Sequence, residues 1–120
     1  MKEPEIITYK GKTIVYLDFT NMKNKDEIIA LENKGAEYIR RQAPKSALTL
    51  TNMENMFFNN ELKSWFADMV KGNAPYVKAG AVLGMSGLIS IMYNAFLQMT
   101  GRNIKAFKTK EEALEYLVSF

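Results

Sequence analysis

The sequence predicts an α/β domain built on a mostly parallel sheet, and three observations lead to this prediction. Runs of apolar, often β-branched residues alternate with amphipathic stretches, as strands and helices do in such folds. Two of these runs are neighbours at the start of the chain, with a glycine between them, which is typical of a β-hairpin. The length of 120 residues suits one domain, residues 1–120, with a single core.

The hairpin is the first predicted element. Residues 5–10 and 13–19 are rich in β-branched and aromatic side chains, and Gly11-Lys12 between them is expected to form a two-residue turn. The second run is apolar almost without interruption, as expected of a strand that is buried on both faces. It should therefore lie inside the sheet, with Asp18 at its carboxyl end.

The first helix is expected to begin at Asn24, whose side chain can cap it, with Glu27 three residues later as in a capping box. Apolar side chains then recur with helical spacing, and the opposite, polar side of the helix includes Glu32. Gly35 costs roughly 1 kcal/mol relative to alanine inside a helix, so we expect the helix to approach the sheet closely there. Pro44 ends the helical stretch.

The remaining elements follow in alternation. We expect strands at 46–51, 78–83 and 104–107. The second helix should be capped by Asn60 and end at Gly72-Asn73, and the third should span 87–100. The last helix should begin with a Thr109–Glu112 capping box. The order is therefore β-β-α-β-α-β-α-β-α. It implies a mostly parallel sheet of four to five strands, opened by a hairpin, with four helices packed on it.

The composition excludes several kinds of chemistry. The chain has neither cysteine nor histidine, which rules out disulfides, thiolate metal sites and every serine–histidine or cysteine–histidine arrangement. Enzymatic chemistry would have to rest on Asp, Glu, Lys or Tyr, and we expect no catalysis, no metal site and no cofactor. The net charge of +3 comes from interspersed residues, which argues against nucleic acid as a partner.

The chain is expected to be cytoplasmic. Its first residues, MKEPE, lack the apolar core of a signal peptide. The longest apolar stretch, 88–99, is too short for a membrane span, which needs roughly twenty residues.

Four stretches carry a resemblance to a known family: residues 76–88 (YVKAGAVLGMSGL), 93–95 (YNA), 100–107 (TGRNIKAF) and 109–117 (TKEEALEYL). Together with the order of elements, they resemble the STAS family, whose namesakes are bacterial anti-sigma-factor antagonists and the cytoplasmic ends of sulfate transporters. More narrowly, the chain is similar to the SpoIIAA-like group, which also has a lipid-transfer-type label. The resemblance implies a regulatory or interaction role and usually no catalysis.

The phosphorylation switch of that family is not matched in this chain. In the switched antagonists, an Asp-Ser-Ser-Gly-like turn follows the third strand, and a serine at the start of the next helix is phosphorylated. Here this place reads Thr51-Asn-Met-Glu-Asn-Met56, with no serine and no following glycine. Ser86 stands on the next strand–helix turn and does not match the phosphorylated position.

Polar side chains stand at or just after the predicted carboxyl ends of the parallel strands: Asp18, Thr20, Asn21, Thr51, Asn52 and Ser86. In the predicted topology these ends meet at one edge of the sheet, where α/β proteins commonly bind ligands. The edge could therefore bind a partner or a small polar ligand. Alternatively, these side chains only satisfy backbone groups of the loops and cap helices.

The turn Gly84-Met85-Ser86-Gly87 has two interpretations. Free backbone N–H groups at a helix start, with glycines that allow close approach, could hold an anion or a polar headgroup. In the structural alternative, the glycines make a tight turn and Ser86 caps the third helix. A hydrolase nucleophile elbow is excluded, because the chain has no histidine.

The predicted third helix is apolar on nearly all sides over 88–99, which include Met92. A helix without a polar face is covered by something. It could be plain core, a homodimer or partner face, or one wall of an apolar pocket completed by Phe57 and Phe58. The predicted function is therefore non-catalytic binding of a protein partner, with a small amphipathic, lipid-like ligand as the alternative.

Overall fold

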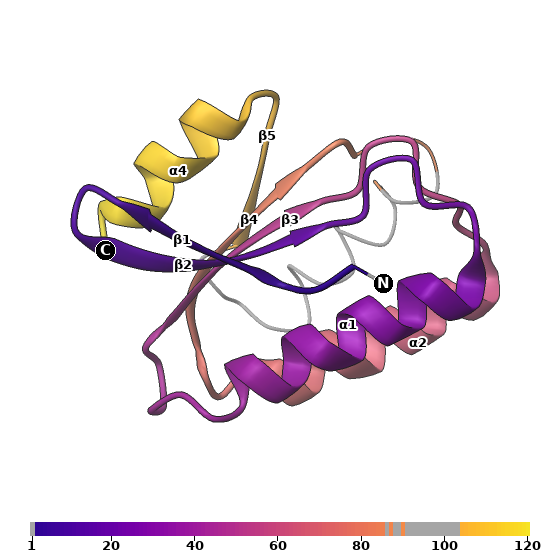
Figure 1. Ribbon diagram of the computed structural model, residues 1–120, viewed down its shortest axis with the longest axis horizontal. Helices are drawn as coiled ribbons and strands as arrows, with labels where there is room; N and C mark the ends of the chain where they lie inside the picture. The colour runs from indigo at the N-terminus through magenta and orange to yellow at the C-terminus, as the bar shows by residue number, and fades with distance from the viewer. Residues whose placement is uncertain (1, 86, 88–89, 91–103) are drawn as a thin grey trace.

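The computed structural model describes residues 2–85, 87, 90 and 104–120. Five strands form one sheet in the order of the chain, with β1 antiparallel to β2 and the other pairs parallel (Figure 1). The strands are β1 (Glu5–Tyr9), β2 (Lys12–Asp18), β3 (Ala47–Asn52), β4 (Val77–Leu83) and β5 (Ile104–Phe107). The mostly parallel sheet opened by a hairpin is therefore confirmed.

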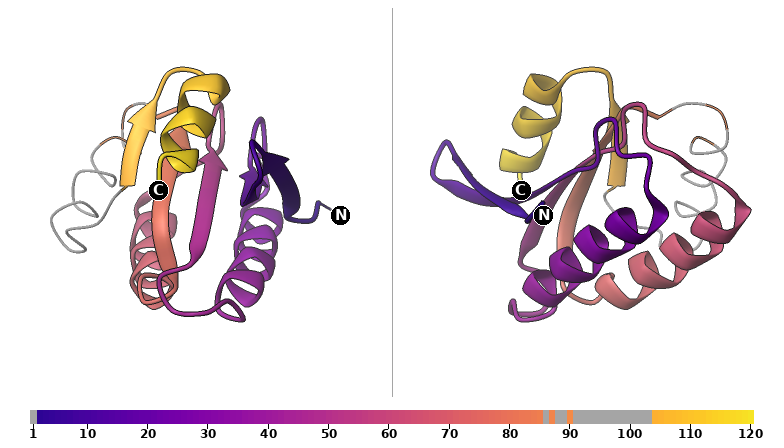
Figure 2. Two further views of the ribbon diagram at one scale, coloured as in Figure 1. Left: turned by 90° about the vertical axis from the view of Figure 1, so that its left-hand side faces the viewer. Right: turned by 45° about the vertical axis from the view of Figure 1, so that its right-hand side comes forward.

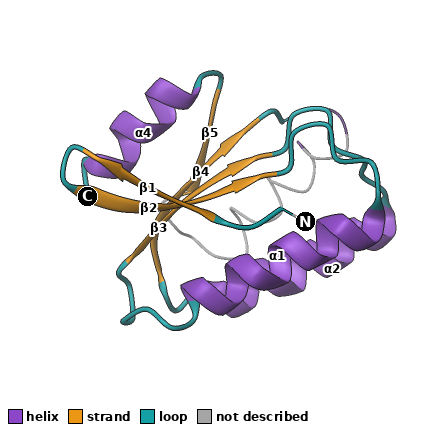
Figure 3. Ribbon diagram, in the orientation of Figure 1, coloured by secondary structure: helices purple, strands orange, loops and turns teal. Residues whose placement is uncertain are grey.

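Three helices are described in full: α1 (Lys25–Ile39), α2 (Asn60–Asn73) and α4 (Lys110–Val118) (Figure 3). The helix predicted at 87–100 lies outside the described residues, apart from Gly87 and Ser90, which are both helical. In the described part of the chain, no helix combines the length and the apolar character that crossing a membrane would require.

The helices cover opposite faces of the sheet. Helices α1 and α2 lie side by side on one face, and α4 lies on the other (Figure 2). Alternate residues of β2 serve the two sides: Val15 and Leu17 belong to the apolar cluster with α1 and α2, whereas Ile14 and Tyr16 belong to the cluster with α4. This explains the continuous apolar run of β2, which is buried on both faces as predicted.

The hairpin turn differs by one residue from the prediction. The two loop residues are Lys10 and Gly11, with φ of 47° and 80°, and Lys12 already belongs to β2. Two central residues with positive φ are the hallmark of the type I′ turn, whose twist matches that of the flanking strands. The prediction that Gly11 is the first loop residue was wrong, because Tyr9 pairs with Lys12 and leaves Lys10 and Gly11 as the two loop residues.

Helix caps confirm two predictions and correct one. The side chains of Asn24 and Thr109 accept hydrogen bonds from the backbone N–H groups of Glu27 (3.0 Å) and Glu112 (3.2 Å). The cap of α2, however, is Asn59, whose Oδ1 accepts from the backbone N–H of Leu62 at 2.9 Å. The predicted cap, Asn60, is instead the first residue of the helix.

Helix α1 confirms the role of its glycine and corrects that of an acidic residue. A Cβ added at Gly35 would lie 2.7 Å from Leu17 Cδ1, so the helix does approach β2 closely. Glu32, which was expected on the polar side, is only 5% exposed. Burial raises the pKa of its carboxyl to about 7, and the charge of Arg40 acts in the opposite direction.

Candidate functional site

The carboxyl ends of the strands form a row of register partners across the sheet. Asp18 pairs with Asn52, Asn52 with Leu83, and Leu83 with Phe107. Because side chains alternate along a strand, this row shares the face of the sheet covered by α4. Thr51 pairs instead with Leu17 and belongs to the opposite face. The predicted edge therefore brings Asp18 and Asn52 together but separates Thr51 from them.

The loops after β2 and β3 are structural copies of each other. We call Asp18–Met22 and Asn52–Met56 the twin loops. In each, the first side chain accepts a hydrogen bond from the backbone N–H two residues later: Asp18 from Thr20 at 3.0 Å, and Asn52 from Glu54 at 3.1 Å. The fourth residue of each is an asparagine with positive φ, 61° at Asn21 and 55° at Asn55.

The second residue of each twin loop anchors it to the core and to the next strand. Phe19 and Met53 are buried, and their backbone N–H groups donate to the carbonyls of Asn52 (2.8 Å) and Leu83 (2.9 Å). The same sequence pattern, Asx-apolar-x-Asn-Met, therefore gives the same turn at the end of two adjacent strands. The two loops consequently present equivalent residues side by side.

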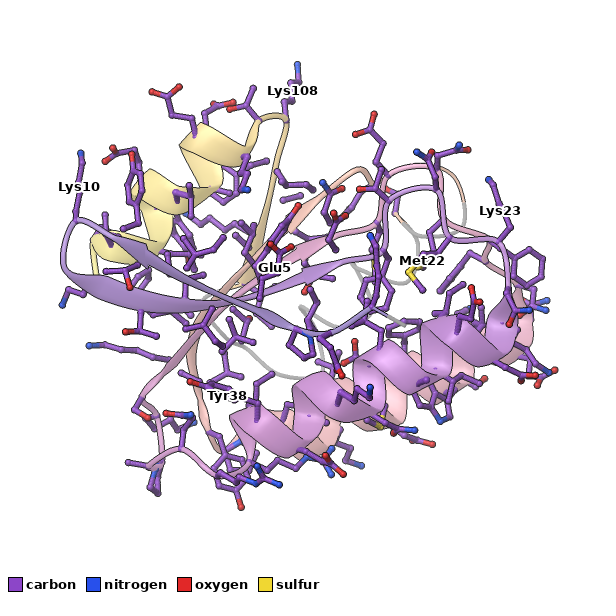
Figure 4. The ribbon with its side chains drawn as sticks, in the orientation of Figure 1. Glu5, Lys10, Met22, Lys23, Tyr38 and Lys108 are labelled. Atoms are coloured by element: carbon purple, nitrogen blue, oxygen red, sulfur yellow. The ribbon has the colours of Figure 1, made fainter. Side chains whose placement is uncertain are left out.

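The twin loops are also joined directly. The backbone N–H of Asn21 donates to the carbonyl of Glu54 at 2.9 Å, and the Asn55 side-chain amide donates to Asn21 Oδ1 at 2.7 Å. Lys23 Nζ donates to Asn55 Oδ1 at 2.9 Å, and Figure 4 shows Lys23 and Met22 beside the start of α1. These bonds hold exposed asparagines, Asn21 and Asn55, in one arrangement before any partner binds.

Gly84 brings the end of β4 against the second twin loop. Its φ of 74° is left-handed, and an added Cβ would lie 2.5 Å from Glu54 Cα. Both the conformation and the contact require glycine, which agrees with the structural interpretation of this residue. Gly87, with φ of 51°, is exposed and has no neighbour where a Cβ would lie.

Asp18 is a partly buried carboxylate held by local donors. Burial by itself would raise the pKa of this group, but the hydrogen bonds from Thr20 and the ammonium of Lys2 outweigh it, so the pKa lies below its ordinary value. Lys2 Nζ lies 3.4 Å from Asp18 Oδ2 and also donates to the Asp18 carbonyl at 2.9 Å. The carboxylate therefore stabilises the loop and stays ionised near neutral pH.

The two adjacent phenylalanines of the β3–α2 connection have different surroundings. Phe57 is 38% exposed, and its backbone N–H donates to the Met22 carbonyl of the first twin loop at 2.8 Å. Phe58 packs on the core, with its ring centroid 6.0 Å from that of Phe66. Phe57 is therefore an apolar side chain at the surface next to the twin loops.

An open hollow of about 780 Å³ lies on the α4 side of this edge. Its walls come from the second twin loop, the ends of β4 and β5, and the start of α4: Asn52, Glu54, Asn55, Leu83, Gly84, Met85, Ser90, Ala106, Phe107, Lys108 and Lys110. Of the predicted site residues, it includes Asn52 and Gly84. Lys108 stands at this edge because it directly follows β5, whose last residue pairs with Leu83, and Lys110 follows at the start of α4.

Other predicted site features remain predictions. Ser86, Met92 and the apolar stretch 88–99 lie outside the described residues, apart from Ser90. Met53 and Met56, which precede Phe57 and Phe58, are core residues with 4% and 7% exposure. Within the described part of the chain, no group of three or more Asp or Glu side chains is placed to hold a metal ion.

Comparison with known proteins supports the predicted architecture. No model of a protein family and no curated protein matches the sequence. Among solved structures, the chain is similar to one described as an anti-sigma-factor antagonist (STAS) domain protein from Planctomyces limnophilus. The two share 15% sequence identity with a TM-score of 0.60, over 98% of this chain and 99% of that chain. The protein therefore has a STAS-like fold.

Proposed function

We propose that this protein is a non-catalytic, regulatory STAS-like domain that binds a protein partner at the carboxyl edge of its sheet. The proposed contact surface consists of the twin loops together with Lys23 and Phe57. The similar solved structure is described as an anti-sigma-factor antagonist (STAS) domain protein, and the resemblance of this sequence to that family implies an interaction role. The proposal extends that mode of action to this chain.

The observation that carries the proposal is the rigid pairing of the twin loops. Asn21 and Asn55 are exposed, yet their backbone conformations and mutual hydrogen bond are fixed by the fold. A pre-organised polar surface loses little conformational entropy on binding, which favours recognition. Phe57 adds the kind of aromatic anchor that interfaces use beside such polar groups.

The chemistry of the edge fits binding better than catalysis. The chain lacks histidine and cysteine, and the carboxylate of Asp18 is engaged by Thr20 and Lys2. A general acid or base near neutral pH needs a pKa near the working pH, whereas the pKa of Asp18 is lowered. Glu32, whose pKa is raised to about 7, lies on α1 and is buried.

Partner capture by matched surface variants tests the proposal. Phe57 and Ile6 are both exposed large apolar residues, at 38% and 47%, but Ile6 lies on β1 rather than beside the twin loops. The wild-type protein and its Phe57→Ser and Ile6→Ser variants are used as baits in lysate of the source cells, with quantitative mass spectrometry. We expect a protein that is captured by the wild type and by Ile6→Ser and is depleted by about tenfold with Phe57→Ser.

Two outcomes count against the proposal. One is equal capture of every enriched protein by all three baits, which would exclude Phe57 from the interface. The other is loss of capture with Ile6→Ser alone, which would move the interface to the hairpin. Circular dichroism of each bait confirms that a lost partner does not reflect a lost fold.

A further inference from the structure

The open hollow beside the twin loops has a charge pattern that partner binding alone does not explain. Its described lining includes two lysines, Lys108 and Lys110, and one acidic residue, Glu54. In the part of the chain that the structure describes, neither lysine forms a salt bridge with a carboxylate. The start of α4 therefore carries positive charge that no carboxylate in the described part of the chain pairs with.

We infer that this hollow receives an acidic segment of the protein partner, with an Asp or Glu side chain between Lys108 and Lys110 and a neighbouring apolar side chain on the floor. The inference rests on the proposed function and names the chemistry of the partner. Asn52, Glu54 and Asn55 belong both to the second twin loop and to the hollow. A single chain could thus contact both regions without interruption.

Lys110 is positioned at the wall by its own neighbours. Its Nζ lies 4.4 Å from the centroid of the Tyr16 ring, an attraction between a cation and an aromatic face. The Tyr16 hydroxyl accepts a hydrogen bond from the Asn52 side-chain amide at 3.4 Å, so the ring is tied to the row of strand ends. This arrangement holds the ammonium group in place but leaves its charge available to a carboxylate.

Lys108 complements it from the turn before α4. This residue is exposed, and Figure 4 shows its side chain pointing outward from the turn between β5 and α4. An exposed ammonium in the lining of the hollow increases the attraction of an acidic partner during approach. The two lysines therefore have different surroundings, because the ammonium of Lys110 lies over an aromatic ring and the side chain of Lys108 is exposed.

The rest of the lining suits an apolar neighbour of the acidic residue. Leu83, Met85, Ala106 and Phe107 contribute apolar atoms. The Phe107 ring lies tilted against the Tyr116 ring of α4, with 5.2 Å between the ring centroids. The hollow is wide and open, which fits a side-chain pair of an extended peptide better than an enclosed small molecule. Glu54 adds specificity, because it repels a second acidic residue placed toward the twin loops.

Selection from a library of random peptides of about twelve residues tests the inference directly. The bait is the full-length protein, and the selected peptides are synthesised with a fluorescent label. We expect enrichment of Asp or Glu next to Leu, Phe or Met. The affinity of these peptides should fall by about tenfold or more with Lys108→Glu/Lys110→Glu and should weaken as salt increases. Nuclear magnetic resonance should show shifts of the Asn52 and Asn55 side-chain amides.

Two further variants serve as controls for charge and folding. Lys71→Glu makes half of the same charge change at an exposed position on α2, and we expect it to leave peptide affinity within about twofold. Lys108→Gln/Lys110→Gln removes the charges without reversing them, and should give a smaller loss. Selected peptides without acidic residues, or with equal affinity for the lysine variants, would overturn the inference. Lysine-dependent binding of phosphatidylserine vesicles without any acidic peptide would also overturn it.

The same variants separate this inference from the proposed function. Suppose that capture of a partner is lost with Phe57→Ser but kept with Lys108→Glu/Lys110→Glu. The binding of an acidic segment in the hollow would then be excluded, and the twin-loop interface would be retained. Capture that neither change affects would contradict both.

Discussion

At the scale of single residues, Glu32 is an acidic side chain that lies buried on the core side of α1. Its neighbours on α1, Ile28 and Leu31, are fully buried core residues, and Glu32 is buried with them. A buried carboxyl group avoids its charged form, which is why its pKa is raised to about 7. The spacing of the buried positions 28, 31, 32, 35, 36 and 39 includes Glu32. Residue type favoured the polar side instead, because a carboxylate is almost always exposed.

The raised pKa of Glu32 predicts a specific pH dependence of stability. The group contributes stability that is fully present below its unfolded pKa of about 4.5 and is lost as the pH rises through about 7. At 1.36 kcal/mol for each pH unit between these values, the loss is about 3 kcal/mol. Glu32→Gln should abolish this loss, so that the variant is more stable than the wild type at pH of about 8.

Urea unfolding at several pH values measures this effect. Glu37→Gln, an exposed carboxyl on the same helix, is the matched control and should follow the wild type. An unchanged pH profile in Glu32→Gln would show that the carboxyl is ionised in the folded protein.

Gly35 makes a second prediction at this scale, because packing and helix propensity oppose each other there. Alanine would gain about 1 kcal/mol of propensity. However, its Cβ would lie 2.7 Å from Leu17 Cδ1 and 2.8 Å from Leu17 Cδ2, and overpacking costs about 1–3 kcal/mol. We expect Gly35→Ala to lower the free energy of unfolding by about 1 kcal/mol.

A double-mutant cycle with Leu17→Val measures the contact itself. The smaller side chain should relieve the clash, so that Gly35→Ala costs less in the Leu17→Val background than in the wild type. Additive effects of the two changes would mean that helix α1 moves away from the sheet without cost.

At the scale of elements, hydrophobic pattern predicted the type and order of the described strands and helices, while boundaries shifted by a residue. Leu17 and Ile14 illustrate the success, because their strand is apolar on both faces and must lie between two layers. The turn at Lys10-Gly11 illustrates the shift. The residue on either side of Gly11 could form the turn with it, and the pairing of Tyr9 with Lys12 selects Lys10.

The cap of α2 gives a test with two adjacent asparagines. Asn59 accepts from the Leu62 N–H, whereas Asn60 is exposed and inside the helix. Asn59→Ala should therefore cost about 1 kcal/mol of stability, and Asn60→Ala should cost nothing or add a few tenths. Thermal or urea unfolding of both variants measures the difference. The reverse order would place the helix start one residue later.

At the scale of the whole molecule, the sequence predicted where the site would lie but not which residues it would unite. Asp18, Asn21 and Asn52 were expected at the carboxyl edge because parallel strands end together there. The repeat of Asx-apolar-x-Asn-Met at Asp18 and Asn52 was present in the sequence, yet it is too short and degenerate to identify a repeated turn. Lys108 also stands at this edge because it directly follows the parallel strand β5. The contact of Lys110 with the Tyr16 ring, in contrast, depends on the packing of α4 on the sheet.

The central claim is that the twin loops form the partner-binding surface, and hydrogen exchange of the partner complex tests it most directly. Backbone amides at 20–23 and 54–57 should exchange more slowly when the captured partner is bound, with no change at the hairpin turn around Gly11. Protection confined to the hairpin or to the outer side of α2, with the twin loops unchanged, would contradict the claim.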